Sequence, residues 1–177
     1  TQAASASLIE GTNLMARRLT EQLLEERSRL QALLPCVPDD AADTACLARF
    51  VADFGRRALR RPLSADEVDE YLDLEVYSVE ENDFLVGVSL VVSAMLQDVE
   101  FLYRVEVGAP VPDHPELRRL DGFELATRLS FLLWGTIPDG PLLDAAETGA
   151  LDTVDGLVAQ ALSMLEHPHA RAQLMRF

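Results

Sequence analysis

The chain has 177 residues, of which 49% are hydrophobic, and a formal net charge of −15. This length supports one well-buried core, or two small cores packed together. So negative a charge repels phosphate backbones and anionic membrane surfaces, which excludes nucleic acid from the expected partners. Every basic residue is arginine and aromatic residues make up only 6% of the chain. The core must therefore rest on Leu, Val and Ala, which favours helices over a sheet.

The N-terminal residues TQAASAS contain no basic region followed by an apolar one. A secretory signal is therefore absent from this chain, and an exported protein would already have lost it. The first apolar periodicity runs from Ser7 to Leu34 and predicts a helix that Pro35 ends. Its packing face is expected to contain Leu8, Leu14, Met15, Leu19, Leu23, Leu30 and Leu34.

The next helices are predicted on either side of a proline. The segment from Cys46 to about Arg60 has apolar residues on one helical face, and it must stop before Pro62. Ser64 then opens a helix through S-A-D-E, a capping box, and this helix is expected to run to about Val79. Its predicted packing side consists of Val68, Tyr71, Leu72, Glu75 and Val76. The apolar run Phe84–Leu96 is too short to span a bilayer and predicts a buried core helix.

The second half is expected to contain further helices after an irregular segment. Residues 98–108 are ambiguous between helix and extended chain, and the prolines of GAPVPDHPEL predict a loop. Asp121 caps a helix through D-G-F-E, Pro141 starts a short one that Gly149 ends, and an amphipathic helix follows at residues 154–165. Pro168 starts the last helix.

These elements predict an all-α fold, a compact bundle of about seven to eight helices that forms either one body or two packed subdomains. The weakest seam is expected at residues 108–115. We therefore divide the chain into an N-terminal module, residues 1–107, and a second module, residues 116–177.

Four arginines, Arg56, Arg57, Arg60 and Arg61, precede an acidic helix in the stretch FGRRALRRPLSADEVDEYL. Arginines in the last turn of a helix offset its dipole, and guanidinium groups can bind carboxylates of neighbouring helices with two hydrogen bonds. The cluster is therefore interpreted as a structural ion-pair network at a helix corner. A site for an anion or an acidic partner is the alternative.

Cys36 and Cys46 bracket a proline-rich acidic loop and form neither C-x-x-C nor a haem-attachment motif. Their separation suits a disulfide that closes a short loop, and two buried thiols remain the alternative. A disulfide would indicate an oxidising compartment.

No metal site is predicted. His114 lies in a loop, and His167 and His169 flank Pro168 without a cluster of carboxylates, so His167 is interpreted as a residue at the end of a helix. The loop acids Asp39, Asp40 and Asp43 lack the spacing and glycine of a calcium loop.

Catalytic motifs such as G-x-S-x-G, phosphate loops and dinucleotide fingerprints are absent from the sequence. Glu100, Trp134 and Asp139 are the residues that an active-site cleft would use, and the simpler interpretation is a core tryptophan with carboxylates that cap helices.

The string CLARFVADFGRRALRRPLSADEVDEYL resembles a helical module of exported planctomycete and myxobacterial proteins, the PSD-type domains of unknown function that accompany cytochrome c-type domains. The strings VSAMLQDVEFLYRVEVG and LDGFELATRLSFLLWGTIPDGPLLDAAETGAL resemble the next module of that group, and VAQALSMLEHPHARAQLMRF resembles its closing helices. The resemblance spans about Leu30 to Phe177.

Two departures from the family pattern stand out. Asp98-Val99 replaces the usual Ser-Pro before the E-F-L-Y-R string, which leaves the turn geometry there open. The chain also ends at Phe177, where the family usually continues, which suggests a piece of a longer protein. The resemblance implies export to the periplasm or cell surface, and it places Cys36 and Cys46 where the family often has a cysteine pair.

The leading hypothesis is a non-catalytic helical scaffold or interaction module of an exported multidomain protein, with no cofactor in this chain and any c-type haem elsewhere in the full-length protein. Its partners would be the remaining domains of the same polypeptide or another protein chain. The alternative is part of an extracytoplasmic enzyme acting on a polymer or small molecule, with a cleft near Trp134 and Asp139. The last helix, with Leu174, Met175 and Phe177, is a third candidate surface, for self-association.

Overall fold

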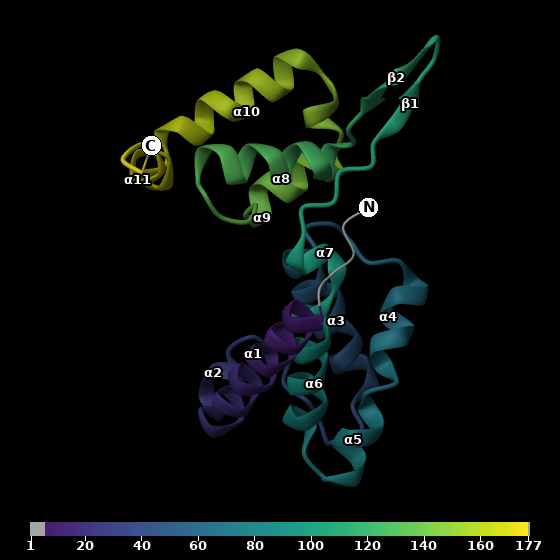
Figure 1. Cartoon of the computed structure of the whole chain (residues 1–177). Helices are drawn as coiled ribbons and strands as arrows, with labels where there is room; N and C mark the ends of the chain where they lie inside the picture. Colours follow the sequence, from purple (N-terminus) through teal and green to yellow (C-terminus); the bar gives the residue numbers. More distant parts are fainter. Residues whose placement is uncertain (1–5, 177) are drawn as a thin grey trace. The chain divides into compact units, whose positions relative to one another are not determined.

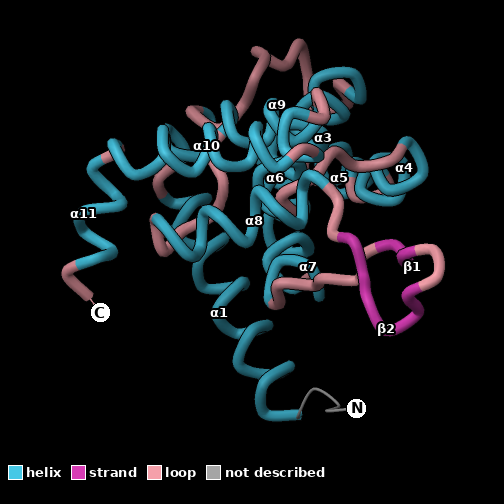
Figure 2. Tube along the Cα trace, turned by 90° about the horizontal axis from the view of Figure 1, so that it is seen from above, coloured by secondary structure: helices cyan, strands magenta, loops and turns pink. Residues whose placement is uncertain are grey.

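Helices dominate both units of the protein. The structure is a computed structural model that describes residues 6–176. The chain divides into two units, Thr1–Tyr103 and Arg104–Phe177, and each is described here by itself. The helices and one small two-stranded sheet (Figures 1 and 2) confirm the predicted, predominantly α-helical class.

Unit 1 is built around one buried helix, α6. In chain order its helices are α1 (Ala6–Glu25), α2 (Arg27–Gln31), α3 (Thr44–Ala58), α4 (Ala65–Leu72), α5 (Glu75–Glu80), α6 (Phe84–Gln97) and α7 (Val99–Leu102). Helices α1, α2, α3 and α5 all contact α6. The expected single helix over residues 7–34 is divided into α1 and α2.

The prediction that residues 84–96 form a buried core helix is confirmed. Asp83 caps the helix, because its side chain accepts a hydrogen bond from the backbone N–H of Leu85. Its buried residues pack with Leu30 of α2 and Phe50 of α3 in one hydrophobic cluster. The buried apolar residues of α6 are Phe84, Leu85, Val88, Val91, Val92 and Met95.

The capping box at Ser64 and Glu67 is confirmed, but the helix that it opens is shorter than predicted. It ends at Leu72, and the chain turns before α5 begins at Glu75. The turn changes which side is buried, so the predicted packing residue Val76 is exposed and Ser78 is buried instead. Ser78 accepts a hydrogen bond from the N–H of Gly87 at 2.9 Å, and a Cβ at Gly87 would lie only 2.2 Å from the Ser78 oxygen.

The predicted packing face of residues 7–34 is confirmed toward its C-terminal end, where Leu23, Leu30 and Leu34 pack in or against the core cluster. It is wrong for the first part of α1, which buries Ala16 and Thr20 rather than its large apolar residues. These small side chains let α1 lie close against α6, and Asn13 donates a hydrogen bond to Gln97 of α6. Leu8, Leu14, Met15 and Leu19, together with Ile9, are 42 to 64% exposed.

A disulfide joins Cys36 to Cys46, across a sequence separation of 10 residues. It connects the loop before α3 to the first turn of that helix. Asp43 caps the same turn, because its carboxylate accepts a hydrogen bond from the N–H of Cys46. The disulfide interpretation of the cysteine pair is thus confirmed.

Unit 2 begins with a hairpin and continues with helices. The strands are β1 (Ala109–Val111) and β2 (His114–Arg119), followed by α8 (Gly122–Leu133), α9 (Gly140–Glu147), the 3-10 helix η1 (Ala150–Asp152), α10 (Val154–Glu166) and α11 (Pro168–Leu174). The structure confirms the predicted cap at Asp121 and the predicted helix start at Pro168. It also confirms the helix stop at Gly149, where φ is 74°. The core of unit 2 contains Leu142, Leu151 and Met164.

The loop predicted for GAPVPDHPEL is wrong, because these residues form the antiparallel hairpin β1–β2. Pro110 can occupy a strand here because a two-stranded sheet consists only of edges. Asp113 makes the turn with a φ of 62°, a left-handed conformation that Asp and Asn adopt more readily than other side chains. The hairpin belongs to unit 2, since the division between the units lies at Tyr103 and Arg104.

Removal of the disulfide should destabilise unit 1. In the double variant Cys36→Ser, Cys46→Ser the unfolded chain is no longer constrained by the loop, which should lower the free energy of unfolding by about 2–3 kcal/mol. Urea unfolding followed by circular dichroism measures this loss. Reductant should lower the stability of the wild type to that of the variant and leave the variant unchanged. Equal stability of the two proteins without reductant would contradict the prediction.

Candidate functional site

Arg61 joins two carboxylates at the corner between α3 and α4. Its Nε and Nη2 atoms lie 2.8 and 2.9 Å from the two carboxylate oxygens of Glu100. Its Nη1 and Nη2 atoms lie 3.0 and 2.6 Å from the oxygens of Glu67. One guanidinium thus binds both carboxylates with two hydrogen bonds each, the strongest geometry for such a pair.

The charges at this corner stabilise one another. The hydrogen bond from Arg61, followed by those from Ser64, lowers the pKa of Glu67 to about 2, although partial burial acts in the opposite direction. The same hydrogen bonds to Glu67 and Glu100 raise the pKa of Arg61 further above its usual value. Glu67 is therefore ionised in this ion pair at neutral pH. Glu100, a candidate catalytic acid, joins α7 to the corner through its hydrogen bonds with Arg61.

Arg60 binds backbone carbonyls. It is only 5% exposed and has a φ of 63°, which is rare for a residue with a side chain. Its guanidinium donates to the carbonyl oxygens of Ala58, Glu100 and Tyr103, the last at 3.0 Å. With Arg60 in the left-handed conformation, two consecutive arginines bind the same segment. Arg60 binds the backbone carbonyls of Glu100 and Tyr103, and Arg61 binds the carboxylate of Glu100.

The other two arginines of the cluster lie farther from α7 in the chain. Arg57 is exposed, lies 3.9 Å from Asp53 and has its guanidinium over the ring of Phe54. Arg56 is partly buried on α3. We call Arg60, Arg61, Glu67 and Glu100 the arginine clamp, because these four residues tie the corner to α7.

Asp98-Val99, where the sequence leaves the turn geometry open, forms a helix start. The carboxylate of Asp98 accepts a hydrogen bond from the N–H of Glu100 at 2.7 Å, and so Asp98 caps α7. Asp98 also approaches Tyr71, where burial and, after it, the charge of Asp98 raise the pKa of the tyrosine hydroxyl to about 12. Aspartate is among the residues preferred at this position of a helix.

Trp134 and Asp139 lie in unit 2 and both stabilise helix ends there. The indole N–H of Trp134 donates to the carbonyl of Met164 at 3.0 Å, and its ring packs beside His167 and His169. Asp139 caps α9 through the N–H of Leu142. A hollow of about 250 Å³ next to Trp134 is also lined by His169, Gln173 and Arg176, among other residues.

His167 caps the last helix. Its Nδ1 atom accepts a hydrogen bond from the N–H of His169 at 3.2 Å, at the junction between α10 and α11. The acids of the Cys-bracketed loop have similar roles, because Asp43 and Asp40 accept hydrogen bonds from the backbone of Asp39 and Ala42. Among residues 6–176 no group of three or more His, Cys, Asp or Glu side chains is placed to hold a metal ion.

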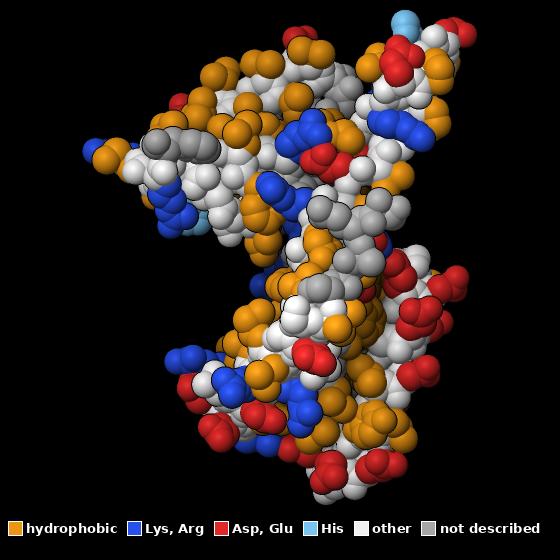
Figure 3. Space-filling view, in the orientation of Figure 1, with side chains coloured by type: hydrophobic (Ala, Val, Ile, Leu, Met, Phe, Trp, Pro, Cys, Tyr) orange, Lys and Arg blue, Asp and Glu red, His pale blue; other side chains and the backbone are white. Residues whose placement is uncertain are grey.

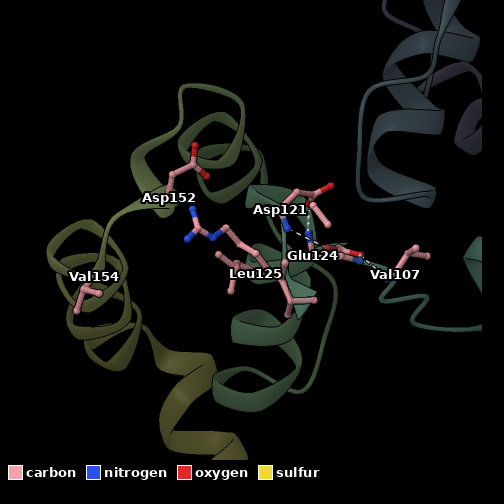
Figure 4. Close-up of a pocket in the computed structure, with 10 residues that line it drawn as sticks. Val107, Asp121, Glu124, Leu125, Asp152 and Val154 are labelled. Atoms are coloured by element: carbon pink, nitrogen blue, oxygen red, sulfur yellow. Dashed lines mark hydrogen bonds between the residues drawn. The ribbon is translucent and has the colours of Figure 1, made fainter. Parts of the chain in front are cut away.

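A hollow of about 790 Å³ lies beside the base of the hairpin in unit 2 (Figure 4). It combines the carboxylates of Asp121 and Asp152 with the guanidinium of Arg119 and with apolar side chains such as Leu125 and Val154. Its lining contains no histidine, cysteine, serine or threonine. The hollow therefore offers charged groups and apolar surface, and its acidic side chains are the carboxylates of Asp121, Glu124 and Asp152.

Glu124 fixes the geometry of this hollow. One carboxylate oxygen accepts hydrogen bonds from the N–H groups of Val107 and Gly108, at 2.6 and 3.0 Å, and the other accepts from Asp121 at 2.8 Å. Burial alone would raise the pKa of Glu124, but these hydrogen bonds outweigh it and lower the pKa. The sequence identified Glu124 only as part of a capping box, because nothing in the pattern indicated that the hairpin base lies against it.

The comparisons with known proteins identify two domains in the chain. Residues 46–106 match the PSD5 family, described as a protein of unknown function (DUF1595), and residues 120–177 match the PSD4 family, described as a protein of unknown function (DUF1592). The chain therefore carries a PSD5 and a PSD4 domain. The PSD5 match includes residues 92–106, so the assignment of the string VSAMLQDVEFLYRVEVG to the second module is wrong for these residues. No curated protein and no solved structure matches the chain significantly.

Neutralising Glu67 should weaken the arginine clamp. The variant Glu67→Gln keeps a side chain that can complete the capping box, but it loses the charge that Arg61 binds. Because Arg61 and Glu67 are 31 and 34% exposed, solvent screens the pair, and we expect a loss of about 1–2 kcal/mol in the free energy of unfolding at pH 7.

This loss should depend on pH. The folded pKa of Glu67 is depressed from 4.5 to about 2, so its contribution is present above pH 4.5 and disappears as the pH falls toward 2. Urea unfolding at several pH values should therefore show the wild type and Glu67→Gln converging in acid. Glu70→Gln, an exposed change on the same helix, is the control and should differ little from wild type at any pH. A gap between wild type and Glu67→Gln that persists at pH 2 would contradict the assignment.

Removing the Glu124 carboxylate should release the base of the hairpin. In Glu124→Ala the N–H groups of Val107 and Gly108 lose their acceptor, so their amide hydrogen exchange should accelerate by about tenfold or more. Hydrogen exchange measured by NMR tests this directly. Glu116→Ala, an exposed change on β2, should leave exchange at Val107 and Gly108 unaltered. Unchanged exchange in Glu124→Ala would show that the carboxylate does not anchor the hairpin.

Proposed function

We propose that this chain is a non-catalytic helical scaffold and interaction module of an exported multidomain protein with c-type cytochrome domains, in which any haem is bound outside these residues. The two family domains and their resemblance to modules that accompany cytochromes support this role. The Cys36–Cys46 disulfide supports an oxidising, extracytoplasmic compartment. No helix within residues 6–176 is long and apolar enough to cross a membrane.

The observation that carries the proposal is an apolar stripe on α10. Val154, Val158, Leu162 and Leu165 follow one another at helical spacing and are 48 to 77% exposed. Figure 3 shows hydrophobic side chains gathered over α10. An exposed contiguous apolar surface of this kind is typical of a protein interaction site. Leu174 and Met175 at the end of α11 are exposed as well, while Phe177 lies outside the described residues.

The charges near the stripe indicate the chemistry of its partner. Asp155 and Glu166 lie near its two ends, and α10 contains no basic residue. Two copies of α10 paired antiparallel would bring Asp155 of one copy close to Glu166 of the other, which costs free energy. A partner with an apolar patch bordered by Lys or Arg fits better.

A role as part of an extracytoplasmic enzyme is the second candidate. The hollow beside Trp134, with His169 and Arg176 in its lining, is the observation that favours it. Turnover of a polymer or small molecule that is lost in Trp134→Ala and His169→Ala would support this candidate. Turnover that survives alanine at Glu100, Trp134 and Asp139 would remove its basis.

Export and haem content can be measured first on protein secreted from its native host. Intact mass with and without reductant and alkylation reports the disulfide, and the visible absorption spectrum reports haem. We expect an oxidised cysteine pair, with the haem band confined to peptides outside residues 1–177. Free thiols in the secreted protein, or haem bound to the isolated chain, would contradict the proposal.

The stripe on α10 should be required for binding. We expect Leu162→Glu to weaken binding by about tenfold or more, because a carboxylate would be buried in the apolar contact. The measurement is biolayer interferometry with a purified c-type cytochrome domain from a protein that carries the same two modules. Leu117→Glu is the matched control, since Leu117 is a comparably exposed leucine on β2 of the same unit. Equal binding by wild type and Leu162→Glu would exclude the stripe as the contact.

A further inference from the structure

Within unit 1, the outer face of α1 is an exposed apolar surface. The helix buries Ala16 and Thr20 against α6 and leaves Leu8, Leu14, Met15 and Leu19 exposed. A shallow hollow of about 330 Å³ lies on this face, lined by Gly11, Leu14, Met15, Arg18, Leu19 and Gln22. Figure 3 shows hydrophobic and arginine side chains together over this part of unit 1.

The first residue that lines this hollow is a glycine, Gly11. A side chain at Gly11 would meet nothing within 4 Å, so the packing of unit 1 itself does not require a glycine there. Glycine weakens the interior of a helix, and its common benefit is the close approach of another backbone. The outer face of α1 is therefore shaped for a second helix.

The charges of this region suit a second copy of the same chain. Residues 1–34 contain four arginines and four acidic residues, so this segment is neutral and the rest of the chain carries the whole net charge of −15. Two such chains repel each other through most of their surfaces. Two chains can approach each other through the region around α1 without this repulsion.

One pair of charges on α1, Glu10 and Arg17, is complementary between two antiparallel copies of the helix. Glu10 and Arg17 are seven residues apart and so lie on the same flank of the helix, and Leu8 and Leu19 lie on the opposite flank. When two identical helices pair antiparallel, equal flanks face each other. A pairing centred between Asn13 and Leu14 then places Glu10 of each copy beside Arg17 of the other, and Leu8 of each beside Leu19 of the other.

We propose that two copies of this chain associate through an antiparallel pair of α1 helices, with Gly11 within the contact. A single pair of helices about 30 Å long makes an interface at the small end of the specific range. We therefore expect a dimer with a dissociation constant of about 1–100 µM. This contact is independent of the stripe on α10, which belongs to the other unit.

Exchanging the charges of Glu10 and Arg17 tests whether α1 forms the contact and whether the two helices pair antiparallel. Glu10→Arg places arginine beside Arg17 of the other copy, and Arg17→Glu places glutamate beside Glu10, so each variant alone should dimerise about tenfold more weakly than wild type. A mixture of the two variants restores opposite charges at both ends. Sedimentation velocity of the 177-residue chain at about 10 µM to 1 mM, with one variant fluorescently labelled, should show the mixed dimer at near wild-type affinity.

Controls separate this contact from general effects of charge. Glu80→Arg makes the same charge change as Glu10→Arg on an exposed position of α5, and it should dimerise like wild type. Far-UV circular dichroism establishes that each variant is folded before its mass is compared. A wild type that stays monomeric throughout this range overturns the proposal. So does a mixture of Glu10→Arg and Arg17→Glu that associates no better than either variant alone.

Discussion

Unit 1 depends on the burial of α6. A helix that is apolar on nearly every side has to be covered on every side, and each large side chain that it buries contributes about 1.5–3 kcal/mol before the cost of ordering the chain. Helices α1, α2, α3 and α5 supply this cover. These helices can approach α6 closely only where small residues meet. At α1 these residues are Ala16 and Thr20, and at α5 Ser78 lies against Gly87 of α6. Because α1 buries its small face, the large apolar residues Leu8, Leu14, Met15 and Leu19 remain at the surface.

The acidic composition sets a second constraint, which the arginines meet. In a chain with a net charge of −15, carboxylates that lie close together destabilise the fold unless a cation or a backbone N–H binds them. Arg61 binds two of them at once, and Glu124, Asp43 and Asp98 each accept hydrogen bonds from backbone N–H groups. The positive charge at residues 56–61 is thus explained in large part by architecture.

Local signals in the sequence predicted local structure well. Caps such as Ser64, Asp121 and Asp139, and the glycine stop at Gly149, depend on a few neighbouring residues, and the structure contains all of them. The buried helix α6 was predictable because its apolar run is long. The hairpin was missed because proline in GAPVPDHPEL argues for a loop, and pairing with a second strand is a nonlocal event. The arginine clamp was anticipated as ion pairs, but the left-handed conformation of Arg60 and its carbonyl contacts have no signature in the sequence.

The face of α1 shows why apolar periodicity alone could not predict burial. Periodicity indicates that one side of a helix avoids water, but it does not say which surface covers that side. On α1 the small residues pack against α6. The large ones remain available to another helix, which in our proposal is α1 of a second copy. The stripe on α10 has the same periodicity but does not suit a second copy of itself, because its flanking charges are both acidic. The flanking charges, more than the apolar residues, therefore distinguish a surface suited to a second copy from one suited to a different, basic partner.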